Sequence, residues 1–357
     1  MAGGVERMAT ALLNDMSARG HETALLTWDL AEAKAFYEFD ERIKWYNLNL
    51  GKHKVKAGWL LRFKRMLKMR ALLKKIQPDV IMAFQHGTFI STRLYSWGMG
   101  FPIIAAEREA PARFEHLKAG KWQWLIYQSF RLATRITIQC ESYRKDYPKY
   151  LHDKIKCISN PVFPSLKFAK PYGSKQTPKI LLCVGRLGYQ KNQTILIKAF
   201  SKISDDFPDW ILNIAGEGGD REVLETQIQK LGLTKRVFLL GAIHDVSAHY
   251  CKSQLMCLPS RWEGFPNAVA ESLSHGLPVV GFEQCAGIRD LIQDKKNGWL
   301  AIGNNNATSL SETLKKAMID NEMRVKLGIE GINSMKSYSP QNVFNIWETF
   351  FEEIKRK

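Results

Sequence analysis

Short apolar segments alternate with helix-like segments along most of the chain. In the second half the apolar segments are residues 179–186, 210–218, 236–241, 254–260 and 277–283, and in the first half they are 22–28, 79–84, 101–107 and 135–140. Apolar strands separated by amphipathic helices are typical of a parallel sheet covered on both faces. The pattern therefore predicts an α/β protein with two doubly wound domains, a cleft between them, and ligands at the carboxyl ends of the strands.

A segment rich in Pro, Lys and Ser separates the two alternating regions and shows little periodicity. It covers residues 160–178. We therefore predict an N-terminal domain over residues 1–162, a linker over 163–177 and a C-terminal domain over 178–338. A length of 357 residues suits two domains of ordinary size.

Composition and charge narrow the class of protein. A hydrophobic content of 45% and a charged content of 24% describe a soluble globular protein, and the net charge of +17 indicates an anionic partner. Six cysteines without a CxxC pair indicate buried thiols of a reducing compartment. No apolar run reaches the roughly 20 residues that a membrane span needs, and the start lacks the layout of a signal peptide.

Two carboxylates stand out in "SRWEGFPNAVAESLSHGLPVV", residues 260–280. Proline and glycine signals predict a helix over 266–275, with Glu263 on the loop before it and Glu271 inside it. The free amides of the helix start, from Gly264 to Ala268, could bind phosphate or sugar oxygens. Glu263 could then accept hydrogen bonds from hydroxyls, and Glu271 could hold a ribose diol. The alternative is that Glu263 only favours the start of the helix and that Glu271 is a solvated surface residue.

Three other strand-end segments carry candidate binding groups. "VGRLGYQKN" (184–192) places Arg186 and Lys191 on a strand-to-helix loop with Gly185, where two cations fit a diphosphate, although such cations are more often surface charges. Gly216 lies in "AGEGG", which resembles a dinucleotide motif only loosely. Ile243 and His244, in "GAIHDV", could flank a base.

These four motifs, in this order, closely resemble the retaining glycosyltransferases of family 4, which use nucleotide sugars and have the GT-B fold of two Rossmann-like domains. The resemblance covers residues 179–302 strongly and 3–27 and 159–162 more weakly. It implies that Arg186 and Lys191 hold the donor diphosphate, that Glu271 binds the ribose and Glu263 the sugar, and that no metal or other cofactor is needed. It also implies that the last helix, 339–357, returns to the first domain. The implied donor-binding residues are Gly185, Arg186, Lys191, Gly216, Ile243, Glu263, Gly264, Phe265, Pro266, Asn267, Ala268 and Glu271.

The front of the chain departs from the family pattern. Members begin with a strand that leads into a Gly-Gly loop, whose amides, here Gly3 and Gly4, would face the phosphate region. The chain instead starts directly before this loop. We therefore expect either that the first strand of the N-terminal domain is missing, which would leave an exposed edge or a gap in its sheet, or that the given start is internal to a longer chain.

The acceptor side is assigned to the first domain. In "AAEREAPARFEH" (105–116), which resembles an element of polysaccharide-assembly members, Glu107 stands where the family often has a histidine. Glu107 is therefore a candidate catalytic residue, and Arg108 and Glu109 are candidates for positioning substrates; the alternative for Glu107 is a structural salt bridge. His86 is a candidate strand-end substrate contact.

A basic segment also belongs to this domain. From Arg42 to Pro78 there are twelve Lys and Arg and no acid. Residues 58–76 read as a helix with Lys64, Lys68 and Lys75 on one face and an aromatic-apolar face opposite, which fits an anionic bilayer. Lys64 and Lys68 could also bind a lipid-linked pyrophosphate acceptor. The alternative is a core helix with a solvated basic side, and nucleic-acid binding is disfavoured because stacking aromatics are not interleaved.

The resulting expectation is a retaining glycosyltransferase of cell-surface polysaccharide or lipopolysaccharide synthesis in a bacterium. It would move a hexose or N-acetylhexosamine from a nucleoside diphosphate sugar to a glycan or polyprenyl-diphosphate-linked acceptor. It would work as a peripheral protein on the cytoplasmic face of the inner membrane. The alternatives are an epimerase or phosphorylase on the same fold, or a non-catalytic binding protein.

Overall fold

The computed structural model describes residues 4–30, 32–51, 57–116, 118–173 and 178–355. The chain divides into two units. Unit 1 comprises Met1–Gln139, Arg144–Pro161 and Gln341–Lys357, and unit 2 comprises Cys140–Tyr143 and Val162–Pro340. Each unit has its own parallel sheet, so each is described separately.

Unit 2 is a doubly wound α/β unit around a six-stranded parallel sheet, with strand order β12-β11-β10-β7-β8-β9. Its strands are β7 (Lys179–Val184), β8 (Trp210–Ala215), β9 (Val237–Gly241), β10 (Leu255–Leu258), β11 (Val279–Phe282) and β12 (Gly298–Ala301). Its helices are α5 (Gln193–Ser201), α6 (Arg221–Lys230), α7 (Val246–Lys252), α8 (Asn267–Ser274), α9 (Ala286–Leu291), α10 (Ala307–Ile319) and α11 (Asn321–Met335). All five strands predicted here from the apolar segments are confirmed, and every pairing is parallel.

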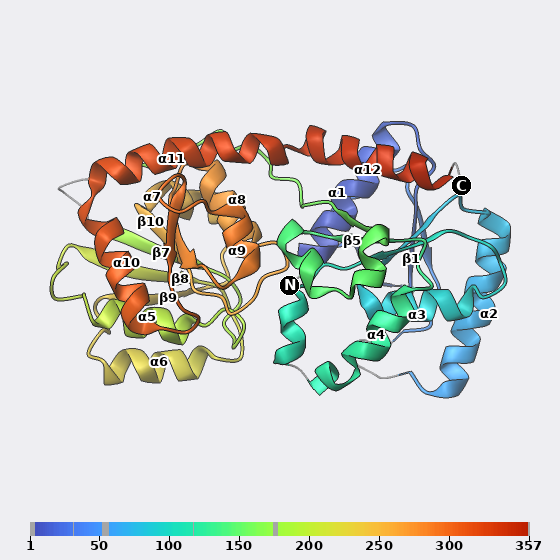
Figure 1. Ribbon diagram of the computed structural model, residues 1–357, viewed down its shortest axis with the longest axis horizontal. Coiled ribbons are helices and arrows are strands. Elements are labelled where there is room, and N and C mark those ends of the chain that lie inside the picture. Colours follow the sequence, from blue (N-terminus) through green and yellow to red (C-terminus); the bar gives the residue numbers. More distant parts are fainter. Residues whose placement is uncertain (1–3, 31, 52–56, 117, 174–177, 356–357) are drawn as a thin grey trace. The chain divides into compact units, whose positions relative to one another are not determined.

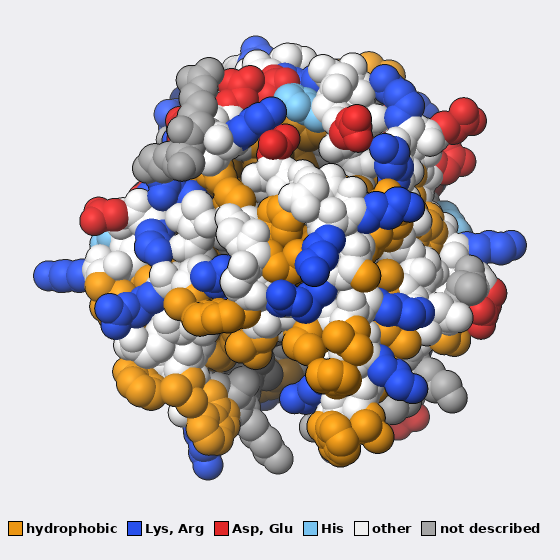
Figure 2. All heavy atoms as spheres, turned by 90° about the vertical axis from the view of Figure 1, so that its right-hand side faces the viewer, with side chains coloured by type: hydrophobic (Ala, Val, Ile, Leu, Met, Phe, Trp, Pro, Cys, Tyr) orange, Lys and Arg blue, Asp and Glu red, His pale blue; other side chains and the backbone are white. Residues whose placement is uncertain are grey.

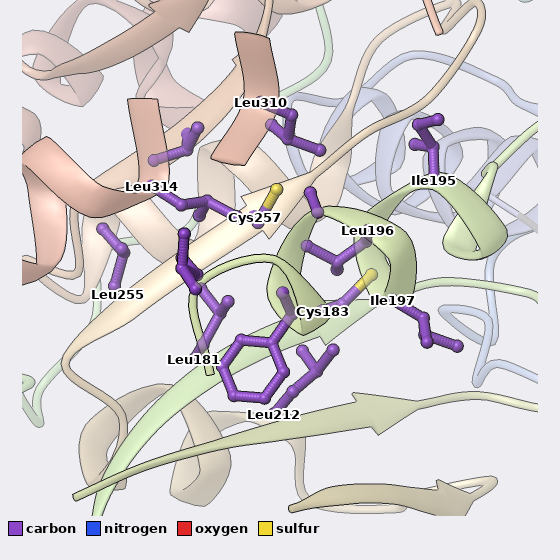
Figure 3. Packing of buried hydrophobic residues seen from close by; sticks show 14 of the residues in the cluster. Leu181, Cys183, Ile195, Leu196, Ile197, Leu212, Leu255, Cys257, Leu310 and Leu314 are labelled. Atoms are coloured by element: carbon purple, nitrogen blue, oxygen red, sulfur yellow. The ribbon is translucent and has the colours of Figure 1, made fainter. Parts of the chain in front are cut away.

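The core of unit 2 forms where the central strands meet α5 and α10 (Figure 3). Leu181 and Cys183 of β7, Leu212 of β8 and Cys257 of β10 are fully buried there. The thiols of Cys140, Cys183, Cys257 and Cys285 are buried, as expected, whereas Cys157 and Cys251 are half-buried, and none of the six forms a disulfide. Burial raises the pKa of Cys183 to about 12, so this thiol acts as a small apolar side chain.

Unit 1 contains two parallel sheets. The four-stranded sheet has the order β3 (Ile81–Phe84), β4 (Ile103–Ala106), β5 (Arg135–Ile138), β6 (Ile155–Cys157), and the two-stranded sheet pairs β1 (Ala24–Thr27) with β2 (Lys44–Asn47). Within the described residues, β1 ends one sheet and β3 ends the other, so the two sheets are separate. The short strands β2 and β6 were not predicted.

Helices and 3₁₀ segments accompany these sheets. The helices of unit 1 are α1 (Gly4–Ala18), α2 (Trp59–Ile76), α3 (Gln85–Tyr95), α4 (Gln123–Phe130) and α12 (Pro340–Lys355). The 3₁₀ segments near them are η1 (Pro111–Glu115), η2 (Lys118–Trp122), η3 (Glu141–Asp146) and η4 (Lys149–Lys154). The helix predicted over 58–76 is thus present as α2. In the part of the chain that is described, no helix is long and apolar enough to cross a membrane.

The last helix, α12, packs against α1 inside unit 1 (Figure 1). Its buried residues Val343, Phe344, Trp347, Phe350 and Ile354 form a stripe at helical spacing, and they share a core with Met8, Leu12 and Met16 of α1. The C-terminal helix α12 therefore completes a hydrophobic core to which the N-terminal helix α1 contributes.

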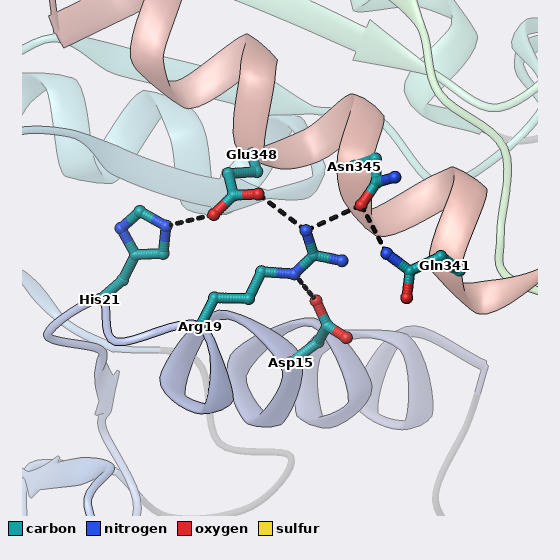
Figure 4. Close-up of polar contacts among 6 residues, drawn as sticks. All are labelled: Asp15, Arg19, His21, Gln341, Asn345 and Glu348. Atoms are coloured by element: carbon teal, nitrogen blue, oxygen red, sulfur yellow. Dashed lines mark hydrogen bonds and ion pairs between the residues drawn. The ribbon is translucent and has the colours of Figure 1, made fainter.

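A polar network borders this core (Figure 4). Arg19 donates to Glu348 Oε2 at 2.7 Å and to Asn345 Oδ1 at 2.8 Å, and His21 Nε2 lies 2.9 Å from Glu348 Oε1. Hydrogen bonds from His21 and Arg19 lower the pKa of Glu348. The network fixes the rotation of α12 about its own axis, because these side chains meet only when the apolar stripe faces α1.

Replacing Trp347 with Ala should loosen unit 1. The indole is fully buried, so its removal should lower the free energy of unfolding by about 3–5 kcal/mol. Hydrogen exchange measured by mass spectrometry should show faster exchange in α1 and α12. The neighbouring Ile346→Ala, which removes a side chain on a residue that is 43% exposed, should change stability by no more than about 0.5 kcal/mol. Equal protection of α1 in both variants would contradict this account of the core.

Candidate active site

The loops after β7 and β10 lie side by side because these strands are neighbours in the sheet of unit 2. The amide of Arg261 donates to the Gln190 carbonyl at 2.8 Å, and the Gln190 side chain donates back to the Trp262 carbonyl at 2.9 Å. Asn192, buried in a left-handed conformation with φ of 56°, donates to the Pro259 carbonyl at 3.3 Å. These bonds tie the two loops into one surface at the carboxyl end of the sheet.

Glu263 and Lys191 form an ion pair at this surface. Lys191 Nζ lies 2.6 Å from Glu263 Oε1, and the hydroxyl of Ser260 donates to the same oxygen at 2.5 Å. The Tyr143 hydroxyl donates to the Glu263 carbonyl. Glu263 is only 4% exposed, so its charge depends on these partners. From the sequence, Lys191 was expected to bind the diphosphate of a donor and Glu263 its sugar. The structure shows that these two side chains also contact each other.

Two glycines allow the backbone after β8 to lie close to the loop after β7. Gly216 has φ of +144°, and a Cβ on it would lie 2.1 Å from the carbonyl oxygen of Gly185, so no other residue fits. Gly185 in turn lies against the Lys191 side chain, whose Cδ and Cε would be 3.3 Å from an added Cβ. Both residues, predicted as donor contacts, shape the backbone beside Lys191. The Arg186 side chain is exposed, and its carbonyl accepts a bond from Gln193 at 3.0 Å.

The helix predicted over 266–275 is α8, and its start differs in detail from the expected row of free amides. Pro266 is the N-cap and has no N–H, and the amide of Asn267 already donates to the Phe265 carbonyl at 2.9 Å. Phe265 is buried, and its ring lies 5.9 Å from that of Tyr338. The Gly264 carbonyl accepts from the Cys140 thiol at 3.2 Å. Ala268 remains a candidate, on a half-buried first turn.

Glu271 lies inside α8, as predicted, and is half-buried. The buried Tyr250 of α7 donates its hydroxyl to Glu271 Oε2 at 3.2 Å. His275 packs on the Tyr250 ring at 5.0 Å, and its Nε2 lies 2.7 Å from Ser247 Oγ. Ile243 is half-buried and His244 is exposed on the loop after β9. The sequence offered no signal for Tyr250 or Ser260, because an isolated Tyr or Ser has no spacing that marks it.

In unit 1, Glu107 lies directly after β4 and is buried. Its Oε1 has no hydrogen-bond partner among the described residues, and burial raises its pKa to about 7, although Arg113 and the His86 amide act in the opposite direction. This carboxyl group therefore binds a proton far more readily than an ordinary glutamate. Among the described residues, Arg113 forms its ion pair with Glu109 rather than with Glu107, so the alternative of a salt bridge at Glu107 finds no support there.

His86 and Arg108 lie near strand ends of the same sheet. Arg113 Nη2 lies 2.7 Å from His86 Nδ1, and since Arg113 can only donate, the His86 ring accepts and is neutral. Burial and Arg113 lower the pKa of His86 to about 4. Arg108 donates to Asn160 Oδ1 at 2.5 Å, and Gln139 donates to the same oxygen at 2.9 Å. Asn160 was not singled out from the sequence.

The other described residues predicted to bind the acceptor lie on helices α1 and α2. Lys64 is exposed on α2, whereas Lys68 donates to the Leu48 carbonyl at 3.1 Å. Gly4 is the first residue of α1, and Gly3 lies outside the described residues.

Two family models together cover nearly the whole chain. The model "Glycosyl transferases group 1" matches residues 165–334, and the model "Glycosyltransferase Family 4" matches residues 2–166. Among solved structures, the lipopolysaccharide outer core galactosyltransferase WaaB covers 98% of this chain and 96% of its own at 19% identity, with a TM-score of 0.77. A sucrose-phosphate synthase from Thermosynechococcus elongatus covers 99% and 94% at 15% identity, with a TM-score of 0.85. The fold is therefore GT-B.

Two curated relatives extend the comparison to sequence. An N-acetylgalactosaminyltransferase of Campylobacter jejuni, whose name gives a GalNAc-bearing diphospho-undecaprenol acceptor, is 26% identical over 99% of this chain and 96% of its own. The lipopolysaccharide 1,6-galactosyltransferase of Salmonella typhimurium is 25% identical over 69% and 67%. The chain is therefore a glycosyltransferase whose first half matches the model of Glycosyltransferase Family 4 and whose second half matches the model of Glycosyl transferases group 1.

The raised pKa of Glu107 predicts a specific dependence of stability on pH. Between about pH 4.5 and 7 the native carboxyl keeps a proton that the unfolded one loses, so its contribution to stability is full below that range and is lost as the pH rises. The unfolding free energy of Glu107→Gln, relative to wild type, should therefore rise by roughly 3 kcal/mol across this range. Urea unfolding at several pH values measures it.

The free energy of unfolding of the variant must be compared with that of the wild type at each pH, because His86 changes the stability of both proteins in the opposite direction. Its lowered pKa adds stability as the pH rises from about 4 to its ordinary 6.5. Glu115→Gln is the control, since this carboxylate is exposed in the same unit and should give a much smaller change. A flat difference for Glu107→Gln would show that the pKa of Glu107 is not raised in the native state.

Proposed function

We propose that this glycosyltransferase moves a hexose or N-acetylhexosamine from a nucleoside diphosphate sugar to a glycan or lipid-linked acceptor, with retention of configuration. The observation that carries the proposal is the Lys191–Glu263 ion pair, which lies beside the exposed Arg186 at the carboxyl end of the unit 2 sheet. The two relatives named above support the acceptor class, because their names give a polyprenyl-linked and a lipopolysaccharide substrate.

In this proposal the donor binds to unit 2 in three parts. Arg186 and Lys191 bind the diphosphate, Glu263 accepts hydrogen bonds from the sugar hydroxyls, and Glu271 binds the ribose. The structure supports these roles by holding both acids in place before the donor arrives: Ser260 and Lys191 fix Glu263, and Tyr250 holds Glu271. Gly185, Gly216, Ile243, Gly264, Phe265 and Ala268 would line the donor site, with Phe265 acting through its backbone.

The reaction breaks the bond between the anomeric carbon and the diphosphate oxygen and forms a bond to the acceptor hydroxyl on the same face. The acceptor proton passes to the departing phosphate oxygen. Negative charge grows on the diphosphate as this bond breaks, and the cations of Lys191 and Arg186 stabilise that charge because they are already oriented. In this proposal the protein supplies the cations, and no metal or other cofactor is needed.

The acceptor is assigned to unit 1, at the strand ends that carry His86, Glu107 and Arg108. A carboxyl whose pKa is about 7 is able to donate or accept a hydrogen bond at neutral pH, which suits an acceptor hydroxyl. We place the protein on the cytoplasmic face of a bacterial inner membrane, as a peripheral enzyme of cell-surface polysaccharide or lipopolysaccharide assembly.

Removing either partner of the ion pair should abolish sugar transfer. We expect Lys191→Ala and Glu263→Gln each to lower sugar transfer about 100-fold or more, because the charge that stabilises the leaving diphosphate is lost or misplaced. The assay is a screen of nucleotide sugars with a bacterial membrane extract as acceptor, scored by labelled sugar in the product. Release of an isomerised nucleotide sugar would instead indicate an epimerase.

Lys179→Ala is the matched control. Lys179 pairs with Asp209 at 3.0 Å, and its side chain is as exposed as that of Lys191, at 20%, but it lies at the first residue of β7 rather than after its last. Loss of this ion pair should leave transfer unchanged. Full turnover by Lys191→Ala, or equal losses in both lysine variants, would rule out this site.

A further inference from the structure

Helix α2 turns large apolar side chains toward solvent. Trp59, Phe63 and Leu67, spaced at i, i+4 and i+8, are 77%, 53% and 50% exposed, and Leu60 beside them is 58% exposed. The residues of α2 that face the core are Met69 and Leu73. The reading of 58–76 as a core helix with a solvated basic side is therefore wrong for its first half, where the aromatic stripe itself is exposed.

The η2–α4 segment of unit 1 also exposes large apolar side chains to solvent. Trp122, at the end of η2, is 63% exposed, and Trp124, at the start of α4, is 67% exposed. The opposite side of α4 is buried through Ile126, Tyr127 and Phe130. These two tryptophans, two positions apart where η2 meets α4, are not needed for the core, and an exposed apolar cluster of this kind marks an interaction surface.

Helix α3 connects these two elements. Arg70 of α2 donates to the carbonyls of Tyr95 and Trp97, at the end of α3, at 3.0 and 2.9 Å. Phe89 of α3 packs on Phe130 of α4 with ring centroids 5.7 Å apart. The three helices thus pack in sequence, and Figure 1 shows α2 and α4 on the same side of the unit. We call the exposed residues Trp59, Leu60, Phe63, Leu67, Trp122 and Trp124 the aromatic face.

The charged side chains of the segments that carry this face are all positive. Residues 42–78 and 116–140 contain no Asp or Glu, and α2 alone carries seven Lys and Arg. Arg65 and Lys68 donate to loop carbonyls, but Lys64, Lys74 and Lys75 are exposed. Figure 2 shows Lys and Arg across the middle of this side of the molecule, with hydrophobic side chains gathered toward the lower edge and acids mostly toward the upper edge.

We propose that the aromatic face binds an anionic lipid bilayer through two elements, α2 and the η2–α4 segment, rather than through one basic helix. Tryptophan favours the boundary between water and acyl chains, and lysine and arginine favour anionic headgroups, so this combination matches one partner. A protein partner would have to be strongly acidic and apolar at once. The inference rests on the proposed function only in that a lipid-linked acceptor gives the enzyme a reason to bind a membrane.

Sedimentation of the full chain with vesicles tests the proposal without donor or acceptor. We expect binding to vesicles that contain phosphatidylglycerol and little binding to pure phosphatidylcholine. Raising the salt concentration from about 0.1 to about 0.5 M should weaken it severalfold, since headgroup charges are then screened. Trp59→Ser/Phe63→Ser and Trp122→Ser/Trp124→Ser should each reduce partitioning roughly tenfold, because each removes two of the four aromatic side chains of this face.

Phe168→Ser/Tyr172→Ser is the matched control, because these two aromatic residues are 52% and 60% exposed in unit 2. It should bind vesicles like the wild type. Loss of binding in only the α2 variant would overturn the two-element surface. Equal binding of all variants, or a dimer in light scattering that dissociates in the aromatic-face variants, would overturn the membrane proposal itself. Turnover of donor with a water-soluble acceptor, measured on the same variants, should stay at the wild-type level, so failure of the membrane proposal is distinguishable from failure of the proposed function.

Discussion

The ion pair between Lys191 and Glu263 is the interaction on which the candidate donor site depends. It joins the loop after β7 to the loop after β10, and it does so where Glu263 is almost completely buried. A carboxylate in such a place is stable only while its partners remain, because water cannot replace them. The pair therefore orders both loops before any ligand binds, and it leaves a cation and an anion where a charged diphosphate and a polar sugar would meet them.

Unit 1 uses burial for a different purpose. Glu107 and His86 are placed so that desolvation disfavours the charged form of each, and the nearby Arg113 partly offsets this for the carboxyl while adding to it for the imidazole. The pKa of Glu107 rises to about 7 and that of His86 falls to about 4, so the carboxyl becomes the weaker acid of the two. Such opposed shifts in neighbouring groups are frequent at functional sites, although ion-pair networks can also produce them. Here the unpartnered oxygen of Glu107 distinguishes the site from a satisfied structural network.

Much of the fold was predictable because it depends on patterns that repeat. Most residues in the strands of unit 2 are apolar, since both faces of that sheet are covered, and five of its strands stand out against the helices around them, whereas β12 was not predicted. The strands β2 and β6 were missed because they are short and include exposed lysines, Lys44 and Lys156, so nothing in their composition separates them from loops. Motifs that follow strands also singled out Glu263, Glu271, Arg186 and Lys191 as candidates, and their roles in binding a donor stay a prediction.

Local sequence determined which segments become strands and helices and which loops carry charge, because periodicity and helix signals act over a few residues. Tertiary structure alone decided which of those charges meet. Glu263 pairs with Lys191, 72 positions away, and α12 completes a core begun by α1. It also decided that Trp59 and Phe63 face solvent while Met69 and Leu73 face the core. Partnership and exposure depend on how the whole chain packs, and no local pattern contains that information.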